Sequence, residues 1–284
     1  MTNKNYSERV ENKLDEFLPN SGALADTMRY SVLDCGKRFR PTLTYTIADM
    51  FEERLEHADS SACAVELIHA YSLIHDDLPA MDNDDIRHSK PACHIRFGES
   101  QAILTGDALQ ALSFEIIAND NNIDPNIRIK CIQQLTHASF EMAQGQSIDM
   151  AIVSSSVDIS VLESMHLKKT GALLTCAVKL GAIISKKCSP KDILILEEYS
   201  KLVGLAYQIQ DDVLDMLVPD NVLGKRQNSD QKKNKPTYPS VLGLEKSQST
   251  YKRFYENSIK SIEKLSVNAN QLIELTNQLQ SRRF

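Results

Sequence analysis

The chain has 284 residues, of which 42% are hydrophobic and 25% charged, a composition typical of a globular protein with enough apolar content for a sizeable core. Its net charge of −6 gives no overall positive field, which argues against nucleic acid as the partner. The N-terminus is polar and no apolar run reaches about 18 residues, so the sequence predicts neither a signal peptide nor a membrane span and favours a cytoplasmic protein.

The chain contains six cysteines, which are far apart in the sequence. They are Cys35, Cys63, Cys93, Cys131, Cys176 and Cys188. Zinc sites and redox motifs need closer pairs of ligands, and small secreted scaffolds need denser ones. The cysteines are therefore expected to be thiols in a reducing cytosol.

The N-terminal part predicts two helices followed by a basic motif. Tyr6, Val10, Leu14 and Phe17 recur at helical spacing, and a second helix from about Leu24 should stop near Gly36. The motif GKRFRP follows at residues 36–41. Three cations at a helix boundary usually form a solvated turn, which the local pattern favours. The alternative is an anion site in which Lys37 and Arg40 converge at a helix start.

Residues 63–77, CAVELIHAYSLIHDD, predict a central helix because they are apolar on most sides, with Asp59 or Ser60 as the N-cap. Five carboxylates follow within ten positions: Asp76, Asp77, Asp82, Asp84 and Asp85. Two such charges about 4 Å apart repel by roughly 4 kcal/mol in a partly buried setting. A positive group must sit among them, or some must be protonated. Pro79 should end or kink the helix and let Asp82 return toward Asp76.

The next segments are predicted to be a basic loop and a series of helices. Residues 86–98 form the loop, with Arg87, Lys90 and Arg96. Helical patterns begin near Ser100 and at Pro125, and another covers residues 167–184. Turns of the Asn-Gly type and alternating runs are missing from the sequence, so we expect an all-α protein.

A second central helix is predicted for residues 192–218. It carries Gln208, Asp211, Asp212 and Asp215. Asp211 and Asp215 are four positions apart and share one helical face, with Gln208 one turn earlier. Residues 219–240 then break the helical pattern and hold five cations, so they form either a mobile solvated loop or a lid that closes on an anion. The chain ends in amphipathic helix, and the absence of a long linker predicts a single domain over residues 1–284.

The two aspartate clusters offer only hard oxygen ligands, which suit Mg²⁺ bridged to substrate phosphates. Cations at positions 37, 40, 87, 169, 225 and 235 would fit a highly anionic substrate such as a diphosphate. The remaining surroundings are apolar helix faces. The sequence therefore indicates a substrate with a diphosphate head and a hydrocarbon tail.

Five motifs in this order resemble the trans-isoprenyl diphosphate synthases, most of all the bacterial type of farnesyl diphosphate synthase. They are GKRFRP, HDDLPAMDNDD, KTGALL, QDDVLD and LGKR with KPTYP, and the resemblance covers about residues 30 to 243. It implies a single bundle of about ten or more helices around a deep central cavity, usually as a homodimer. It also implies condensation of isopentenyl diphosphate with an allylic diphosphate (dimethylallyl, then geranyl) to give farnesyl diphosphate and pyrophosphate.

The resemblance also implies roles for individual residues. Asp76, Asp82 and Asp211 would hold three Mg²⁺ ions on the allylic diphosphate, with Asp77 and Asp215 in support and Asp212 in the same candidate metal set. Arg87, Lys169 and Lys225 would bind that diphosphate. Lys37, Arg40 and His69 would bind isopentenyl diphosphate. Thr170 and Gln208 would lie near the developing carbocation. Lys235 is a further candidate for substrate binding, while contacts of Gln146 and Asp149 with ligand are left open.

Two positions bear on specificity. The family pattern has two arginines after the first aspartate cluster, whereas this chain has Arg87 followed by His88, which puts its affinity for isopentenyl diphosphate in question. His88 could still donate when protonated near pH 6.5. Tyr71 is bulky and Ser72 is small at the expected cavity floor, so Tyr71 should stop elongation near fifteen carbons.

Four other interpretations fit parts of the sequence. Geranylgeranyl diphosphate synthase is the serious alternative within the family. A metal phosphohydrolase could use the dipeptide His75–Asp76, but it leaves Asp211 unexplained. A non-catalytic partner subunit would be expected to lose one aspartate cluster, and a terpene cyclase would leave GKRFR without a role.

Overall fold

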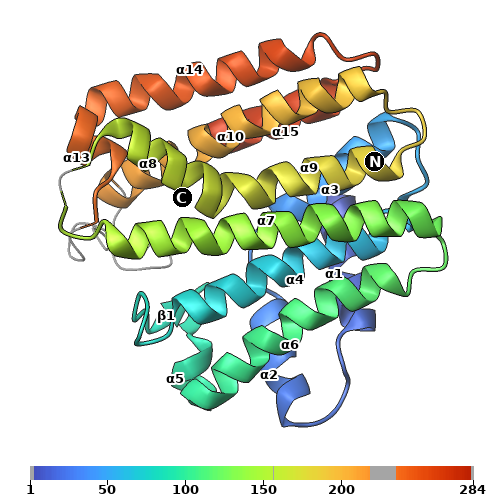
Figure 1. Cartoon of the computed structure of the whole chain (residues 1–284), viewed down its shortest axis with the longest axis horizontal. Coiled ribbons are helices and arrows are strands. Elements are labelled where there is room, and N and C mark those ends of the chain that lie inside the picture. Colours follow the sequence, from blue (N-terminus) through green and yellow to red (C-terminus); the bar gives the residue numbers. More distant parts are fainter. Residues whose placement is uncertain (1–2, 156, 218–234, 283–284) are drawn as a thin grey trace. The chain divides into compact units, whose positions relative to one another are not determined.

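The computed structural model of the chain describes residues 3–155, 157–217 and 235–282. Almost all regular structure in these residues is helical (Figure 1), which confirms the predicted all-α class. The chain divides into two compact units. Unit 1 comprises Met1–Leu135 and Leu180–Lys187, and unit 2 comprises Thr136–Lys179 and Cys188–Phe284.

Unit 1 contains the N-terminal helices. They are α1 (Asn3–Phe17), α2 (Ala23–Val32), α3 (Phe39–Met50), a short 3₁₀ turn (Leu55–His57), α4 (Asp59–Asp76), α5 (Cys93–Phe97) and α6 (Glu99–Ala118). The helical spacing read from the first segment is correct, because Tyr6, Val10 and Leu14 are fully buried. Helices α7 (Pro125–Ala151) and α9 (Ala172–Ile184) contribute residues to both units.

Helix α4 is the central helix of unit 1, as predicted. Most of its side chains are buried, including Leu67 and Ile68 at 0% exposure. It packs along α6, and also against α3 and α1 (Figure 1). Burial of a Leu or Ile side chain contributes roughly 1.5–3 kcal/mol, so this helix supplies much of the core of the unit.

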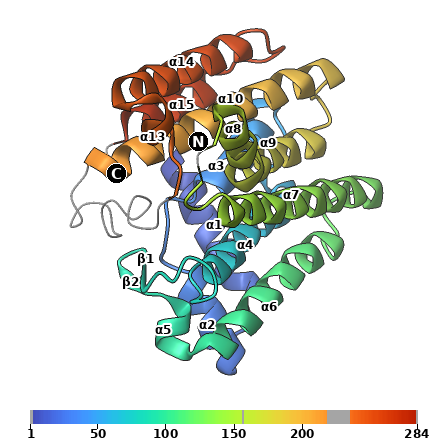
Figure 2. The same cartoon turned by 60° about the vertical axis from the view of Figure 1, so that its left-hand side comes forward.

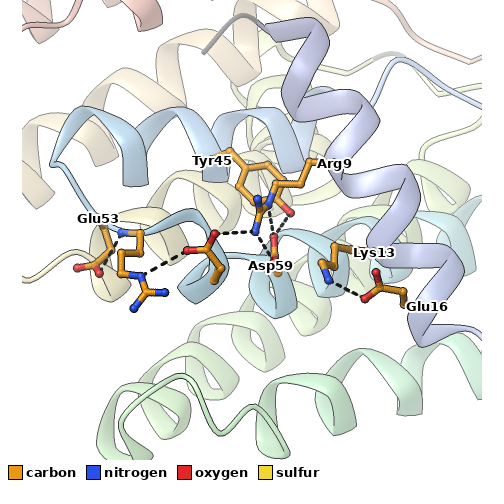
Figure 3. A network of polar contacts seen from close by, with 8 residues as sticks. Arg9, Lys13, Glu16, Tyr45, Glu53 and Asp59 are labelled. Carbon is orange, nitrogen blue, oxygen red and sulfur yellow. Dashed lines mark hydrogen bonds and ion pairs between the residues drawn. The ribbon is translucent and has the colours of Figure 1, made fainter.

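The predicted N-cap of α4 is wrong. Ala58 occupies the cap position, and Asp59 is the first helical residue. The carboxylate of Asp59 instead accepts hydrogen bonds from Arg9 and from the hydroxyl of Tyr45, each at 2.7 Å (Figure 3). A buried carboxylate without hydrogen-bond partners would be costly, and the free energy gained from these partners is larger than that gained from capping a helix end.

The basic loop predicted over residues 86–98 has regular structure. Strands β1 (Ile86–Arg87) and β2 (Lys90–Pro91) pair antiparallel, and α5 follows them (Figure 2). His88 and Ser89 form the turn with φ of 50° and 61°. Positive φ at both central residues is the geometry of two-residue hairpins, which is usually encoded by Asn-Gly. A His-Ser turn lacks that signal, so the sequence did not reveal it.

Unit 2 contains the second aspartate helix. Its elements are α8 (Ile159–His166), a π-helical turn η2 (Leu167–Gly171), α10 (Pro190–Leu217), α13 (Tyr238–Leu242), α14 (Leu244–Ile262) and α15 (Asn270–Ser281). Helix α10 packs along α14 (Figure 1), as expected for a central helix. Most of the predicted lid, including Lys225, lies outside the described residues.

Two further findings concern the chain as a whole. All six cysteines are free thiols. Across the described ranges, no helix combines the length and the apolar character needed to cross a lipid bilayer.

Candidate active site

The first aspartate cluster lies at the end of α4. The helix ends at Asp76, and the N–H of Asp82 donates to the carbonyl of Asp76 at 2.8 Å. The N–H of Asp84 donates in the same way to the carbonyl of Asp77 at 3.2 Å. The return of the chain after Pro79 is therefore confirmed, and it brings the backbone of Asp82 against that of Asp76.

The carboxylate of Asp77 is paired with Arg87. It is 2% exposed, and Arg87 donates to both of its oxygens. Burial raises the pKa of Asp77, and the charge of Arg87 offsets part of that rise. In return, the hydrogen bond and charge of Asp77 raise the pKa of Arg87 against the effect of burial. Asp77 thus fixes the guanidinium of Arg87 beside the first cluster.

Basic side chains gather around His69 in unit 1. Burial lowers the pKa of His69 well below its usual value, and the nearby charges of Arg40, His88 and Arg87 lower it further. His69 is therefore neutral at pH 7 and can serve as a hydrogen-bond donor or acceptor. Of the predicted anion-binding residues, Arg40, His69, Arg87 and His88 are brought together, and Lys37 lies exposed before α3.

The third cation of GKRFRP has a structural role. Arg38 is 5% exposed and adopts a positive φ of 50°. Its guanidinium pairs with Glu66 at 2.8 Å and with Glu11 at 2.7 Å. The interpretation of this motif as a solvated turn is therefore wrong for Arg38, because its guanidinium neutralises the buried carboxylate of Glu66 and the half-buried one of Glu11.

The surroundings of His88 lower its pKa. Desolvation and the charges of Arg87, Arg38 and Lys90 lower its pKa to about 4, even though the residue is exposed. This pKa lies below the value near 6.5 expected from the sequence, and the predicted contact of His88 with isopentenyl diphosphate stays a prediction. The positive φ of His88 suits this residue type, since histidine is enriched among non-glycine residues in the left-handed region.

The second aspartate cluster in unit 2 belongs to a hydrogen-bonded chain. The Thr170 hydroxyl donates to Gln208 Oε1 at 2.9 Å, and Gln208 Nε2 donates to Asp212 at 3.2 Å. The other oxygen of Asp212 accepts from the backbone N–H of Tyr238 at 3.0 Å. Asp212 is 3% exposed, so its carboxylate serves to hold the side chain of Gln208 and the backbone of Tyr238 in place.

Asp211 has a different environment from its neighbours. Its side chain is 38% exposed and lies 2.6 Å from the guanidinium of Arg282, near the end of the chain. Asp215, one turn later, is 3% exposed. Asp211 is thus the most accessible carboxylate of the QDDVLD motif.

Lys169 and Thr170 are presented by the π-helical turn η2. A Cβ atom at Gly145 of α7 would lie closer than 3.0 Å to the backbone of Lys168 and Lys169. Only glycine permits this approach, so Gly145 allows η2 to pack directly against α7. π-Helical turns are frequent at functional sites, and this one displays two predicted site residues.

Asp149 on α7 binds two lysines at once. Lys169 Nζ and Lys235 Nζ lie 2.7 and 2.8 Å from the same carboxylate oxygen. Burial raises the pKa of Asp149, but both lysines outweigh it and lower the pKa overall. Gln146, one turn earlier, is 7% exposed, and both polar atoms of its amide lack a hydrogen-bond partner among the residues that the structure describes. This face of α7 therefore combines a carboxylate that fixes two lysines with a buried amide.

The carboxylates suit a magnesium ion that is completed by substrate. Mg²⁺ is usually bound through one or two carboxylates together with substrate phosphates and waters. In the described residues, no group of three or more His, Cys, Asp or Glu side chains is arranged to hold a metal by itself. In unit 1, Asp76 and Asp82 supply hard oxygens that are not fully buried, and in unit 2 Asp211 does so.

Comparison with known proteins identifies the family. The sequence profile of the polyprenyl synthetase family matches residues 21–275. The chain belongs to this family. It is 42% identical to the farnesyl diphosphate synthase of Escherichia coli (strain K12) over 247 residues, 86% of this chain and 83% of that protein. It is also 42% identical to the geranylgeranyl diphosphate synthase of Cyanophora paradoxa over 246 residues, 84% of this chain and 82% of that protein.

A solved structure supports the same assignment. The geranyltransferase of Helicobacter pylori, in complex with magnesium and isoprenyl diphosphate, superposes with a TM-score of 0.88 at 27% identity, covering 98% of this chain and 94% of that one. This polyprenyl synthetase is therefore a trans-prenyltransferase that condenses isopentenyl diphosphate, in a family that uses Mg²⁺.

Several site residues of this polyprenyl synthetase were missed by sequence reasoning. Arg282 lies outside the motifs, and Tyr238, although it belongs to KPTYP, gave no indication that its backbone N–H would bond to Asp212. Gly145, which precedes Gln146, could have signalled that another segment of backbone lies close to α7 at this point. Lys225 lies outside the described residues, so its predicted role has no structural test.

Proposed function

We propose that the enzyme is a farnesyl diphosphate synthase, which adds isopentenyl diphosphate to dimethylallyl diphosphate and then to geranyl diphosphate. The observation that carries the product length is Tyr71, a bulky side chain five residues before Asp76. It is 8% exposed and held against α6. A fixed ring at this depth would block a chain longer than fifteen carbons. The resemblance to bacterial farnesyl diphosphate synthases supports the same product.

Asp76, Asp82 and Asp211 are proposed to hold Mg²⁺, with three ions when substrate is bound. The metal would neutralise the charge that grows on the leaving diphosphate. Asp77 and Asp212 would act by fixing Arg87 and Gln208, and Asp215 would support Asp211. Asp77, Asp212 and Asp215 are almost fully buried, so a supporting role fits them better than direct ligation.

The cations are proposed to divide between two diphosphates. Arg87, Lys169 and Lys235, together with Lys225, would bind the allylic diphosphate. Lys37, Arg40 and His69, with His88, would bind isopentenyl diphosphate. The cluster around His69 supports the second group, because a polyanion there would relieve the mutual repulsion of Arg40 and Arg87.

The reaction follows from this arrangement. The allylic C–O bond breaks, and the diphosphate leaves with the bonding electron pair while the cations of the chain stabilise its charge. The double bond of isopentenyl diphosphate attacks the allylic cation to form a C–C bond, and a proton then passes to the departed diphosphate. The oxygens of Thr170 and Gln208 would lie near the cation, where their dipoles favour positive charge.

Geranylgeranyl diphosphate synthase is the second candidate. The equal identity to the Cyanophora paradoxa enzyme supports it, because sequence identity alone gives no preference between the two products. The side chain of Ser72, next to Tyr71, is small and would obstruct a longer chain less than a bulky one.

The proposal also includes a cytoplasmic homodimer built from single polyprenyl synthase domains. The family match over residues 21–275 includes parts of both units, which supports one domain. Ile95, Ile103 and Leu104 are exposed apolar residues on α5 and α6, and a second copy could cover them. Light scattering coupled to size-exclusion chromatography would measure the oligomeric state.

One assay tests the proposed reaction. Purified protein is incubated with Mg²⁺, isopentenyl diphosphate and labelled dimethylallyl or geranyl diphosphate, and the products are sized by chromatography. We expect fifteen-carbon product, which disappears when EDTA removes the metal. A dominant twenty-carbon product would instead establish the second candidate. Asp76→Asn and Asp211→Asn should each lower kcat by about 100-fold or more, the size of effect seen when charge stabilisation is lost.

A further inference from the structure

Tyr238 links α8 to α10 within unit 2. Its backbone N–H donates to Asp212 Oδ2 of α10 at 3.0 Å, and its hydroxyl donates to Glu163 Oε1 of α8 at 3.1 Å. Tyr238 is 0% exposed, so both of its polar groups are withdrawn from water and depend on these partners. Glu163 belongs to none of the motifs that resemble the family.

The ring of Tyr238 is also fixed. It stacks on the imidazole of His166, with ring centroids 5.6 Å apart and an interplanar angle of 16°. Buried apolar side chains of α8 and α10 complete its surroundings. The side chain is therefore confined to the position in which its hydroxyl meets Glu163 while its backbone meets Asp212.

Asp212 passes this constraint on to the candidate site. Its other oxygen accepts from Gln208 Nε2 at 3.2 Å. A carboxylate only accepts hydrogen bonds, so it must face the NH₂ group of the amide, and Oε1 of Gln208 is turned away from it. That Oε1 accepts from the hydroxyl of Thr170 at 2.9 Å. The donor direction of each bond is thus fixed, and the oxygens of Gln208 and Thr170 keep lone pairs that can face a positive charge.

Thr170 lies only seven residues after Glu163 in the sequence. Helix α8 ends at His166, and the π-helical turn η2 then carries Thr170. The hydrogen bonds that start at Glu163 therefore return, through Tyr238 and the side chains of α10, to the same stretch of chain. In such a closed network the position of each member depends on the others.

We propose that Glu163 is a positioning residue for prenyl transfer, which acts through Tyr238 to orient the oxygens of Gln208 and Thr170. The inference rests on the proposed function, in which these two oxygens lie near the allylic cation. A dipole stabilises a cation only when its negative end is turned toward the charge, so the benefit depends on orientation. Glu163 supplies this orientation from α8 without contact with the substrate.

The test measures the single-turnover rate, which product release does not limit, and KM for labelled geranyl diphosphate with isopentenyl diphosphate present. Tyr238→Phe removes only the hydroxyl, and Glu163→Leu removes its acceptor. Each should lower the single-turnover rate about three- to tenfold, the range that one hydrogen bond controls. KM should stay within about twofold, because Lys235 keeps its bond to Asp149. Glu163→Gln keeps an acceptor and should retain the rate within about twofold.

Two further variants separate a positioning role from a loss of stability. The double variant Glu163→Leu/Tyr238→Phe should be no slower than the slower single variant, because the same bond is lost in all three. Tyr199→Phe is the matched control. Tyr199 is also a fully buried tyrosine of unit 2, and its hydroxyl shares a hydrogen bond with Thr276 at 2.9 Å. This control loses a bond of the same kind and should keep the rate within about twofold.

The outcomes distinguish this inference from the proposed function. Gln208→Leu tests the role of the amide directly, and the product length of the unsubstituted enzyme tests the farnesyl assignment. A slow Gln208→Leu enzyme beside normal rates in Tyr238→Phe and Glu163→Leu would overturn the inference alone, whereas a normal rate in Gln208→Leu would overturn both. The inference also fails if Tyr199→Phe is as slow as Tyr238→Phe, or if the two single effects multiply in the double variant.

Discussion

The guanidinium of Arg282 lies 2.6 Å from the carboxylate of Asp211, the most accessible acid of the second aspartate cluster. The same guanidinium donates to Gln210 at 3.0 Å and to the carbonyl of Tyr207 at 2.8 Å, and it lies over the Tyr207 ring at 3.7 Å. The end of the described chain is therefore anchored to the part of α10 that carries the QDDVLD motif.

Arg282→Gln should lower the free energy of unfolding by about 1–3 kcal/mol, because charge-assisted hydrogen bonds and the stacking on Tyr207 are lost together. Asp211 is partly exposed and keeps its hydration, so the loss should stay below that of a fully buried pair. Urea unfolding followed by circular dichroism measures the change. Arg253→Gln, on the exposed surface of α14, is the control and should shift stability by less than about 0.5 kcal/mol.

Asp149→Asn should reduce both activity and stability. The substitution leaves Lys169 and Lys235 without their shared carboxylate, and the side chain of Lys235 is only 10% exposed. We expect kcat/KM for the allylic diphosphate to fall about 10- to 100-fold, since the lysines lose their position. Steady-state kinetics with varied geranyl diphosphate measures this effect.

The matched control for Asp149→Asn is Asp158→Asn. Asp158 is the exposed N-cap of α8, where its side chain accepts from the N–H of Ser160, and asparagine caps equally well. An Asp149→Asn enzyme with normal kcat/KM would mean that this carboxylate does not position Lys169 for the substrate.

The helices and the first aspartate turn could be predicted because local rules determine them. The apolar period of residues 63–77 placed α4, and Pro79 predicted the chain reversal that the Asp82–Asp76 hydrogen bond confirms. The His88–Ser89 turn was missed because both residues have positive φ, and the sequence indicates such a turn clearly only when Asn or Gly occupies these positions.

Long-range partners could not be predicted from the sequence. Asp149 meets Lys169 and Lys235 at sequence separations of 20 and 86 residues, and Arg38 meets Glu66 at a separation of 28. Helical periodicity says which face of a helix is apolar, but it does not say which distant charge will lie against it. The residue types in the candidate site were therefore predictable, whereas the contacts that hold them were not.

His88→Arg should lower KM for isopentenyl diphosphate about three- to tenfold. His88 is neutral at pH 7, so arginine would add a permanent charge and a forked donor for a phosphate. Repulsion from Arg87 and Lys90 and the positive φ at this position limit the gain. His88→Gln, a neutral donor, is the control and should leave KM within about twofold. Equal KM values in all three enzymes would place side chain 88 out of reach of the substrate.

Tyr71→Ala should convert the enzyme to longer products. Removing the ring opens the space between α4 and Gln110 of α6, and chain growth would continue to twenty carbons or more. The cavity also costs stability, about 3–5 kcal/mol for loss of a large aromatic side chain, so assays should be run well below the melting temperature. Chromatography of the labelled products gives the result. Ser72→Ala changes the neighbouring side chain and should keep the original product, whereas unchanged products from Tyr71→Ala would remove Tyr71 from this role.

His88 should also make the fold less stable in mild acid. Its pKa is about 4 in the folded protein and about 6.5 in an unfolded chain, so between these values the unfolded state binds a proton that the folded state does not. Stability therefore rises with pH across this window and falls as pH is lowered from about 7.5 to about 5. His69, whose pKa is also lowered, acts in the same direction. The His88→Gln variant lacks this titrating group and keeps only the pH dependence that the other groups contribute. Its free energy of unfolding in urea should therefore fall less than that of the original enzyme between these two pH values. An equal fall in both proteins would show that His88 titrates normally in the fold.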